Sequence, residues 1–202
     1  ISGVITDGGK FKWDTEKYPG MKDFKKFGPF AYTAKLRNGL FRNTGACLSP
    51  QNAFYNSIGM ETLGLRMERV CDNAKTLAQF FATEYSDIEV NYPGLAGSKW
   101  HNIATEQFGD KFGGIITIRT GNKKRAFGII DALKLPLIVS NIGDTKTLVI
   151  HPESTLNVHS TQEEKETAGV FDDLIRISVG IEDIEDLIDD FKQAIESVKD
   201  VY

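Results

Sequence analysis

The chain has few cysteines and no long hydrophobic run. Cys47 and Cys71 are the only cysteines among 202 residues. They form neither a disulfide framework nor a Cys-x-x-Cys metal pair, and we expect both thiols to be buried and reduced in a cytoplasmic protein. No apolar run approaches the ~20 residues of a membrane-spanning helix, and no secretory signal is recognisable. We therefore expect no contact with a membrane.

An excess of basic charge is also missing. The net charge is −4, and acidic and basic residues are interspersed along the chain. A nucleic-acid surface would need a basic stripe, so we expect no nucleic-acid partner. The glycine-rich phosphate motifs GxGxxG and GxxxxGK are absent. His151 and His159 have no third ligand at a suitable spacing, which argues against a metal site.

The most informative pattern in the sequence lies at positions 174–188. Ile175 and Ile177 alternate with Arg176, which predicts a strand with one apolar face and one face that carries an arginine. Gly180 ends this strand, and apolar residues at helical spacing follow it. Arg176 is either an arginine on the wet face of a sheet or a rigidly held guanidinium for a carboxylate. Spacing alone favours the surface arginine.

The pattern elsewhere predicts an α/β fold, in which helices cover one face of a sheet and the other face forms a cleft wall. The predicted strands are 1–6, 88–94, 114–120, 137–140, 147–150 and 174–179. The predicted helices are 30–43, 50–85 with a break near Gly59 and Gly64, 101–108, 123–133, 161–167 and a last helix after Gly180. Residues 10–29 are predicted to form a loop.

Four long motifs resemble a known family. They are LIRISVGIEDIEDLIDDF (174–191), NIGDTKTLVIHPEST (141–155), GMETLGLRMERVCDNA (59–74) and VNYPGL (90–95). Together they resemble the Cys/Met-metabolism family of pyridoxal-phosphate-dependent enzymes, and within it the O-acetylhomoserine sulfhydrylases.

The resemblance implies a domain organisation. Residues 1–49 would be the remnant of a large cofactor-binding domain of the aspartate-aminotransferase-like fold, and 50–87 a connecting helical segment. Residues 88–202 would form the small C-terminal α/β domain, with a mainly antiparallel sheet covered by helices. The family's Schiff-base lysine would lie a few residues before Ile1, and the surroundings of Lys35 do not match it. We therefore expect no catalytic or cofactor-binding residue in this chain, which alone would be inactive.

The resemblance also implies substrate-binding residues. Arg176 matches the arginine that anchors the α-carboxylate of the substrate. Asn141 would supply a second contact, and Thr155 a weaker one. Leu156 and Asn157 stand where the family has threonine and histidine, and this departure bears on which substrate is used.

The function that follows is a γ-replacement with pyridoxal 5'-phosphate as cofactor. Acetate of O-acetylhomoserine would be exchanged for sulfide or a thiol in a homotetramer that includes the missing N-terminal half. One alternative in the same family is a γ-lyase or γ-synthase acting on cystathionine or methionine, although Asn141 in place of serine favours the sulfhydrylase. A second alternative is a non-catalytic binding or assembly domain, in which Arg176 holds an anionic ligand or a partner.

Overall fold

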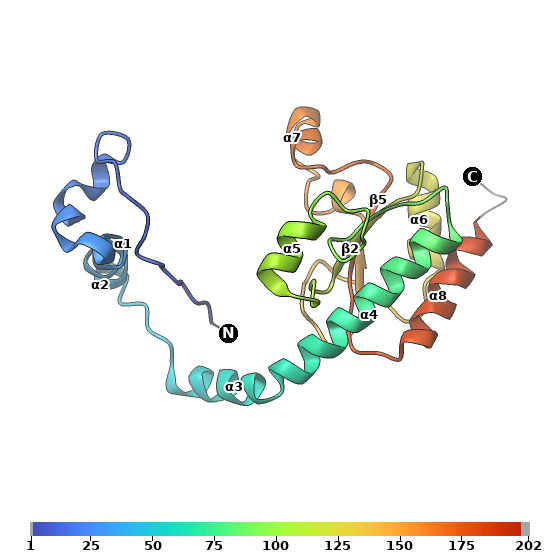
Figure 1. Ribbon diagram of the computed structural model, residues 1–202, viewed down its shortest axis with the longest axis horizontal. Coiled ribbons are helices and arrows are strands. Elements are labelled where there is room, and N and C mark those ends of the chain that lie inside the picture. Colours follow the sequence, from blue (N-terminus) through green and yellow to red (C-terminus); the bar gives the residue numbers. More distant parts are fainter. Residues whose placement is uncertain (1, 199–202) are drawn as a thin grey trace. The chain divides into compact units, whose positions relative to one another are not determined.

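The computed structural model describes residues 2–198. The chain divides into two compact units, Ile1–Thr62 and Leu63–Tyr202 (Figure 1). Among the described residues, no helix is long and apolar enough to cross a membrane.

The N-terminal unit is a series of short helical segments. They are the 3-10 segment η1 (Pro19–Phe30), α1 (Ala31–Leu36), the π-helical turn η2 (Arg37–Phe41), α2 (Arg42–Thr44) and α3 (Pro50–Glu61). The predicted strand at 1–6 is wrong for its described part, because residues 2–6 have no strand to pair with. The prediction of a loop over 10–29 overlooked η1. The prediction for Cys47 is also wrong, since its thiol is exposed, whereas Cys71 is buried.

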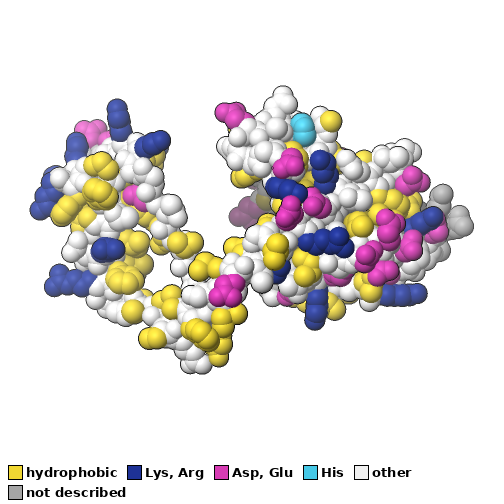
Figure 2. All heavy atoms as spheres, turned by 60° about the horizontal axis from the view of Figure 1, so that its bottom comes forward, with side chains coloured by type: hydrophobic (Ala, Val, Ile, Leu, Met, Phe, Trp, Pro, Cys, Tyr) yellow, Lys and Arg dark blue, Asp and Glu magenta, His cyan; other side chains and the backbone are white. Residues whose placement is uncertain are grey.

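This unit buries very little apolar surface. Trp13 stacks on Tyr32 at 5.8 Å between ring centroids, but only Met21 and Ala31 are buried among its described residues. Figure 2 shows hydrophobic side chains on the face that it draws, and many large apolar side chains of this unit are exposed. They are Val4, Ile5, Phe11, Phe27, Phe30, Leu40, Phe41, Leu48, Phe54, Tyr55, Ile58 and Met60.

The long helical pattern of residues 50–85 is two helices. Ser49 caps α3 by accepting a hydrogen bond from the Asn52 amide at 3.2 Å, and Pro50 occupies the first helical position, as the sequence predicts. The break falls at Thr62, between the two glycines that mark it in the sequence. Helix α4 (Leu63–Glu84) then begins the C-terminal unit.

The C-terminal unit contains a five-stranded sheet in the order β1-β2-β5-β4-β3. Its strands are β1 (Glu89–Asn91), β2 (Ile115–Arg119), β3 (Leu137–Ile138), β4 (Leu148–Ile150) and β5 (Leu174–Ser178). Only the β3–β4 pair is parallel, so the sheet is mainly antiparallel, as expected. Strand β5 is central and pairs with β2 and β4.

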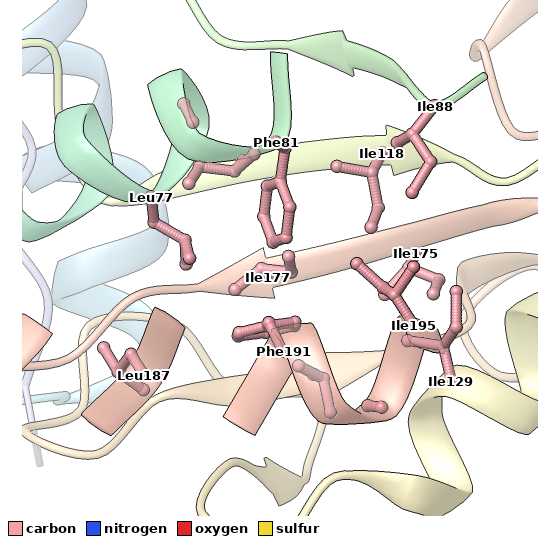
Figure 3. Close-up of a cluster of buried hydrophobic side chains, with 14 of the residues drawn as sticks. Leu77, Phe81, Ile88, Ile118, Ile129, Ile175, Ile177, Leu187, Phe191 and Ile195 are labelled. Carbon is pink, nitrogen blue, oxygen red and sulfur yellow. The ribbon is translucent and has the colours of Figure 1, made fainter. Parts of the chain in front are cut away.

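Helices cover one face of this sheet. The remaining helices are α5 (His101–Phe108), α6 (Lys123–Ala132), the short 3-10 turn η3 (Pro152–Ser154), α7 (Gln162–Thr167) and α8 (Ile184–Ser197). Buried side chains of α4, α6 and α8 pack on the alternate residues Ile175 and Ile177 of β5 (Figure 3). Phe81 and Phe191 meet edge to face at 5.2 Å in this core.

The compact unit begins at Leu63 rather than at residue 88. Helix α4 belongs to it because Leu77, Ala78 and Phe81 are fully buried against the sheet. The predicted segments 1–49 and 50–87 therefore do not coincide with the compact units. The assignment of residues 1–49 to a larger cofactor-binding domain stays a prediction.

The second face of the sheet is partly buried: Glu89 and Asn91 of β1 are exposed and Thr117 of β2 is half-buried, whereas the part around β5 and β4 is buried. Leu174 and Ser178 flank Arg176 on this face, and both are buried. Their neighbours on β4, Leu148 and Ile150, are 2 % exposed. Arg176 therefore lies in a partly dehydrated setting but is not fully buried, and the choice between a surface arginine and a carboxylate anchor stays a prediction.

Candidate functional site

Arg176 lies at the middle of the central strand. Its partners across the sheet are Thr117 on β2 and Ile150 on β4. The side chain is half-buried, and its Nη2 donates to the carbonyl oxygens of Ser140, at 2.8 Å, and Asn141, at 3.4 Å. Its Nε is buried and has no hydrogen-bond partner among the described residues. The guanidinium is thus oriented by backbone while part of its donor capacity is unused.

The electrostatics of Arg176 suit an anionic ligand. Burial lowers the pKa of the guanidinium from its ordinary value, but an arginine remains charged in proteins. No carboxylate among residues 2–198 forms an ion pair with it within 4.0 Å. A partly buried charge without a counter-ion is costly, and a ligand carboxylate would offset that cost by two parallel hydrogen bonds.

A second arginine on the same face is already neutralised. Arg119 contacts Asp173 at 2.9 Å and Glu89 at 3.6 Å, and its guanidinium lies 4.0 Å from the centre of the Phe171 ring. It lines a cavity of about 840 Å³ with Asn91, Trp100 and Thr117. Because the charge of Arg119 is already paired, this arginine is a weaker candidate for binding an anion than Arg176.

The structure brings Asn141 to Arg176 through its backbone. The Asn141 carbonyl accepts from the guanidinium, and its side chain is exposed and forms no hydrogen bond with other described residues. Sequence reasoning missed Ser140, whose carbonyl makes the shorter contact. No sequence pattern could reveal it, because a backbone carbonyl carries no side-chain signature.

Thr155 lies in a segment whose residues are hydrogen-bonded to one another. Its hydroxyl donates to the carbonyl of His151 at 2.7 Å, and the ring of His151 contacts the Asp172 carbonyl and the Ser154 hydroxyl at 2.7 and 2.9 Å. No hydrogen bond joins Thr155 to Arg176 in the part of the chain that the structure describes. Its role in substrate binding stays a prediction. Leu156, at the position of the family threonine, is 53 % exposed.

An ion cluster fixes this same segment and was also missed. The Glu153 carboxylate contacts Lys123 at 2.8 Å and Lys165 at 2.6 Å. The hydrogen bonds from Lys123 and Lys165 lower the pKa of Glu153 to about 2. The three residues come from α6, η3 and α7, so local spacing gives no sign of the contact.

The histidines do not build a metal centre. Within residues 2–198, no group of three His, Cys, Asp or Glu side chains could hold a metal ion. His101 contacts the Pro93 carbonyl at 2.9 Å and stacks on Phe112, which makes it a structural residue.

Comparison with known proteins decides the family. The family model "Cys/Met metabolism PLP-dependent enzyme" matches residues 1–196. The chain belongs to this family. The expected resemblance is thereby confirmed, and with it the dependence of the family on pyridoxal phosphate.

Curated relatives place the chain within the family. It is 38% identical over 209 residues to a homocysteine synthase of Schizosaccharomyces pombe, covering 97% of this chain and 49% of the relative. It is also 38% identical over 209 residues to an O-acetyl-L-homoserine sulfhydrylase of Corynebacterium glutamicum, covering 95% of this chain and 47% of the relative. The chain thus spans about half the length of the curated relatives it matches.

A solved structure agrees with the fold. A Campylobacter jejuni structure, assigned as an O-acetylhomoserine (thiol)-lyase and containing a pyridoxyl-lysine monophosphate, is 39% identical with a TM-score of 0.74. The match covers 80% of this chain and 39% of that one. The α/β fold expected from the sequence is therefore confirmed.

Four helix starts of the chain are occupied by their own caps, whereas α5 begins without a side-chain cap. Phosphate sites in proteins favour free backbone amides at a helix N-terminus. Here α3, α6, α7 and α8 each use their own cap, since a side chain already accepts a first-turn amide hydrogen bond. We assign no cofactor contact to a residue of this chain, and the expectation of none stays a prediction.

Proposed function

We propose that this chain is the substrate-carboxylate-binding part of an O-acetylhomoserine sulfhydrylase. The enzyme exchanges the γ-acetate of O-acetylhomoserine for sulfide or a thiol, giving homocysteine or methionine. The observation that carries the proposal is Arg176, a half-buried guanidinium without an acidic partner among the described residues, held on the central strand by the Ser140 carbonyl. The names and coverage of the curated relatives support the same assignment.

The residues of this chain act on the α-carboxylate end of the substrate. The guanidinium of Arg176 would bind the carboxylate through its accessible donors, which fixes the orientation of the amino acid. Asn141 adds its exposed side-chain amide from the adjoining loop, and Thr155 is proposed as a weaker contact. Pyridoxal phosphate, when bound, supplies the electron-withdrawing chemistry of the reaction.

The assembly of the enzyme belongs to the proposal as well. A homotetramer that includes the N-terminal half would cover the exposed apolar side chains of residues 4–60. The chain by itself is expected to be inactive. Asn141 in place of serine is our reason for preferring the sulfhydrylase over a γ-lyase of the same family.

The proposal is tested by NMR titration of this chain with O-acetyl-L-homoserine. We expect weak binding that shifts the Arg176 Nε–H resonance. Arg176→Lys should weaken binding by about 10-fold or more, because lysine cannot reproduce the planar pair of donors. In the complete enzyme, Arg176→Ala should lower kcat/KM by ~30-fold or more.

Arg119→Lys is the matched control, since it changes an arginine of the same face whose charge is already paired. Its affinity should stay at the wild-type value. Binding by Arg176→Lys within about threefold of wild type would show that the carboxylate is held elsewhere.

A further inference from the structure

The turn after β5 holds the loop that orients Arg176. Residues 139–147 connect β3 to β4, and the carbonyls of Ser140 and Asn141 at its start contact the guanidinium. The other end of the loop meets residues Gly180–Glu182. These two segments are far apart in sequence, and their contacts decide where the loop lies.

Glu182 is the centre of this contact. One carboxylate oxygen accepts from the Thr147 amide, and the other accepts from the Thr147 hydroxyl at 2.9 Å. The same hydroxyl oxygen accepts from the Gly180 amide at 2.9 Å. Thr147 is fully buried, so these charge-assisted bonds form where water competes little.

Two further bonds fix the loop to the strand. The Ile181 amide donates to the Thr145 carbonyl at 2.9 Å, and the Gly143 amide donates to the Ser178 hydroxyl at 3.2 Å. Ser178 lies on the same face of β5 as Arg176. The loop is therefore bonded to Ser178 of β5 and to Ile181 in the turn that follows β5.

Helix α4 holds the turn from the opposite side. The buried Asn73 amide donates to the carbonyls of Gly180 and Glu182 at 3.1 and 2.9 Å. Arg69 also donates to the Glu182 carbonyl, at 3.1 Å. The backbone carbonyl of Glu182 is thus hydrogen-bonded to helix α4, while its carboxylate is hydrogen-bonded to Thr147 of the loop.

From this arrangement we infer that Glu182 is a positioning residue for the carboxylate anchor. It holds residues 140–147 against β5, so that the Ser140 carbonyl keeps the Arg176 guanidinium in the orientation that receives a carboxylate. The inference rests on the proposed function, because it assigns a role in the same site. Glu182 itself touches no substrate.

The test compares Glu182→Gln and Glu182→Ala with Glu185→Gln in this chain. Glu185 is exposed, three residues further along, and it controls for the change of charge. Two quantities are measured by NMR, the affinity for O-acetyl-L-homoserine and the line width of the Arg176 Nε–H signal. The line width reports how well the guanidinium of Arg176 is ordered. It separates a loss of order at Arg176 from a loss of stability in another part of the chain.

We expect Glu182→Ala to weaken binding by about fivefold or more and to broaden the Arg176 signal, because small misplacements of an orienting group are costly. Glu182→Gln keeps one acceptor for the Thr147 amide, so it should fall between wild type and Glu182→Ala. If Glu182→Ala does not fold, the intermediate behaviour of Glu182→Gln decides the question.

The outcomes separate the two proposals. If Glu182→Gln and Glu182→Ala bind as wild type with an unchanged Arg176 signal, while Arg176→Lys loses affinity, the positioning role is wrong and the anchor stands. An equal effect of Glu185→Gln would also overturn the positioning role. If Arg176→Lys binds as wild type, the proposed function itself fails.

Discussion

Two arginines on one sheet face differ in their partners. Arg119 is surrounded by two carboxylates and an aromatic ring, whereas Arg176 has two backbone carbonyls and a buried Nε without a partner. A carbonyl orients a guanidinium without cancelling its charge. This difference is the reason for proposing Arg176, rather than Arg119, as the carboxylate anchor.

Glu153 gives a prediction about pH. Its pKa in the folded chain, about 2, lies below the ordinary value of 4.5, so its charged form stabilises the fold above pH ~4.5, and the contribution is lost as pH falls towards 2. After screening by solvent, the contribution is about 1–2 kcal/mol.

Glu153→Gln should therefore lower the free energy of unfolding at pH 6 by this amount, with no difference from wild type near pH 2. Urea unfolding at a series of pH values measures it. A difference that is the same at all pH values would contradict the ion-pair explanation.

Gly180 gives a prediction about close packing. A Cβ at this position would lie 2.5 Å from the Thr145 carbonyl oxygen and 2.5 Å from the Glu182 carboxylate. Gly180→Ala should destabilise the chain by about 1–3 kcal/mol and weaken binding of O-acetyl-L-homoserine. At Gly97 a Cβ would meet nothing within 4 Å, so Gly97→Ala should leave the stability and the affinity unchanged. Thermal unfolding measures the stability, and titration measures the affinity.

At the scale of elements, the core on the helical face of the sheet determines stability. Phe81 of α4 is fully buried and meets Phe191 of α8, so α4 is a structural part of the C-terminal unit. Phe81→Ala should cost about 3–5 kcal/mol in chemical unfolding. Gln79→Ala, on the exposed side of the same helix, should change it by less than about 0.5 kcal/mol. A small effect of Phe81→Ala would mean that α4 does not complete this core.

At the scale of the whole molecule, the two units differ in buried apolar surface. The described part of the N-terminal unit buries Met21 and Ala31, while the C-terminal unit has a continuous core. A unit with few buried contacts opens at low cost. Limited proteolysis should therefore cut within residues 2–62 well before residues 63–198. Equal rates of cutting in the two units would contradict this difference.

The exposed apolar residues also predict that the chain associates with itself, which sedimentation measurements would detect.

A further prediction concerns the cofactor. Because we expect no Schiff-base lysine among the residues of this chain, the chain with added pyridoxal phosphate should show no visible absorbance of a lysine-bound cofactor and no turnover. Reduction with borohydride followed by peptide mapping provides the measurement. A cofactor bound to Lys10, Lys12 or Lys35 would contradict the expectation that no lysine of this chain forms the Schiff base.

The sequence by itself determined the elements of the C-terminal unit and the family. Alternating Ile175 and Ile177 require a strand with one buried face, and Ser49-Pro50 specifies a helix start, because these signals act between residues close in the chain. It did not determine that the other face of β5 is buried, that α4 joins the core, or that residues 2–6 lack a partner strand. Tertiary structure decided these points, as it did the contacts of Arg176 with Ser140 and of Glu182 with Thr147. Such contacts join segments far apart in sequence, and their energy appears only when the packed core has brought the segments together.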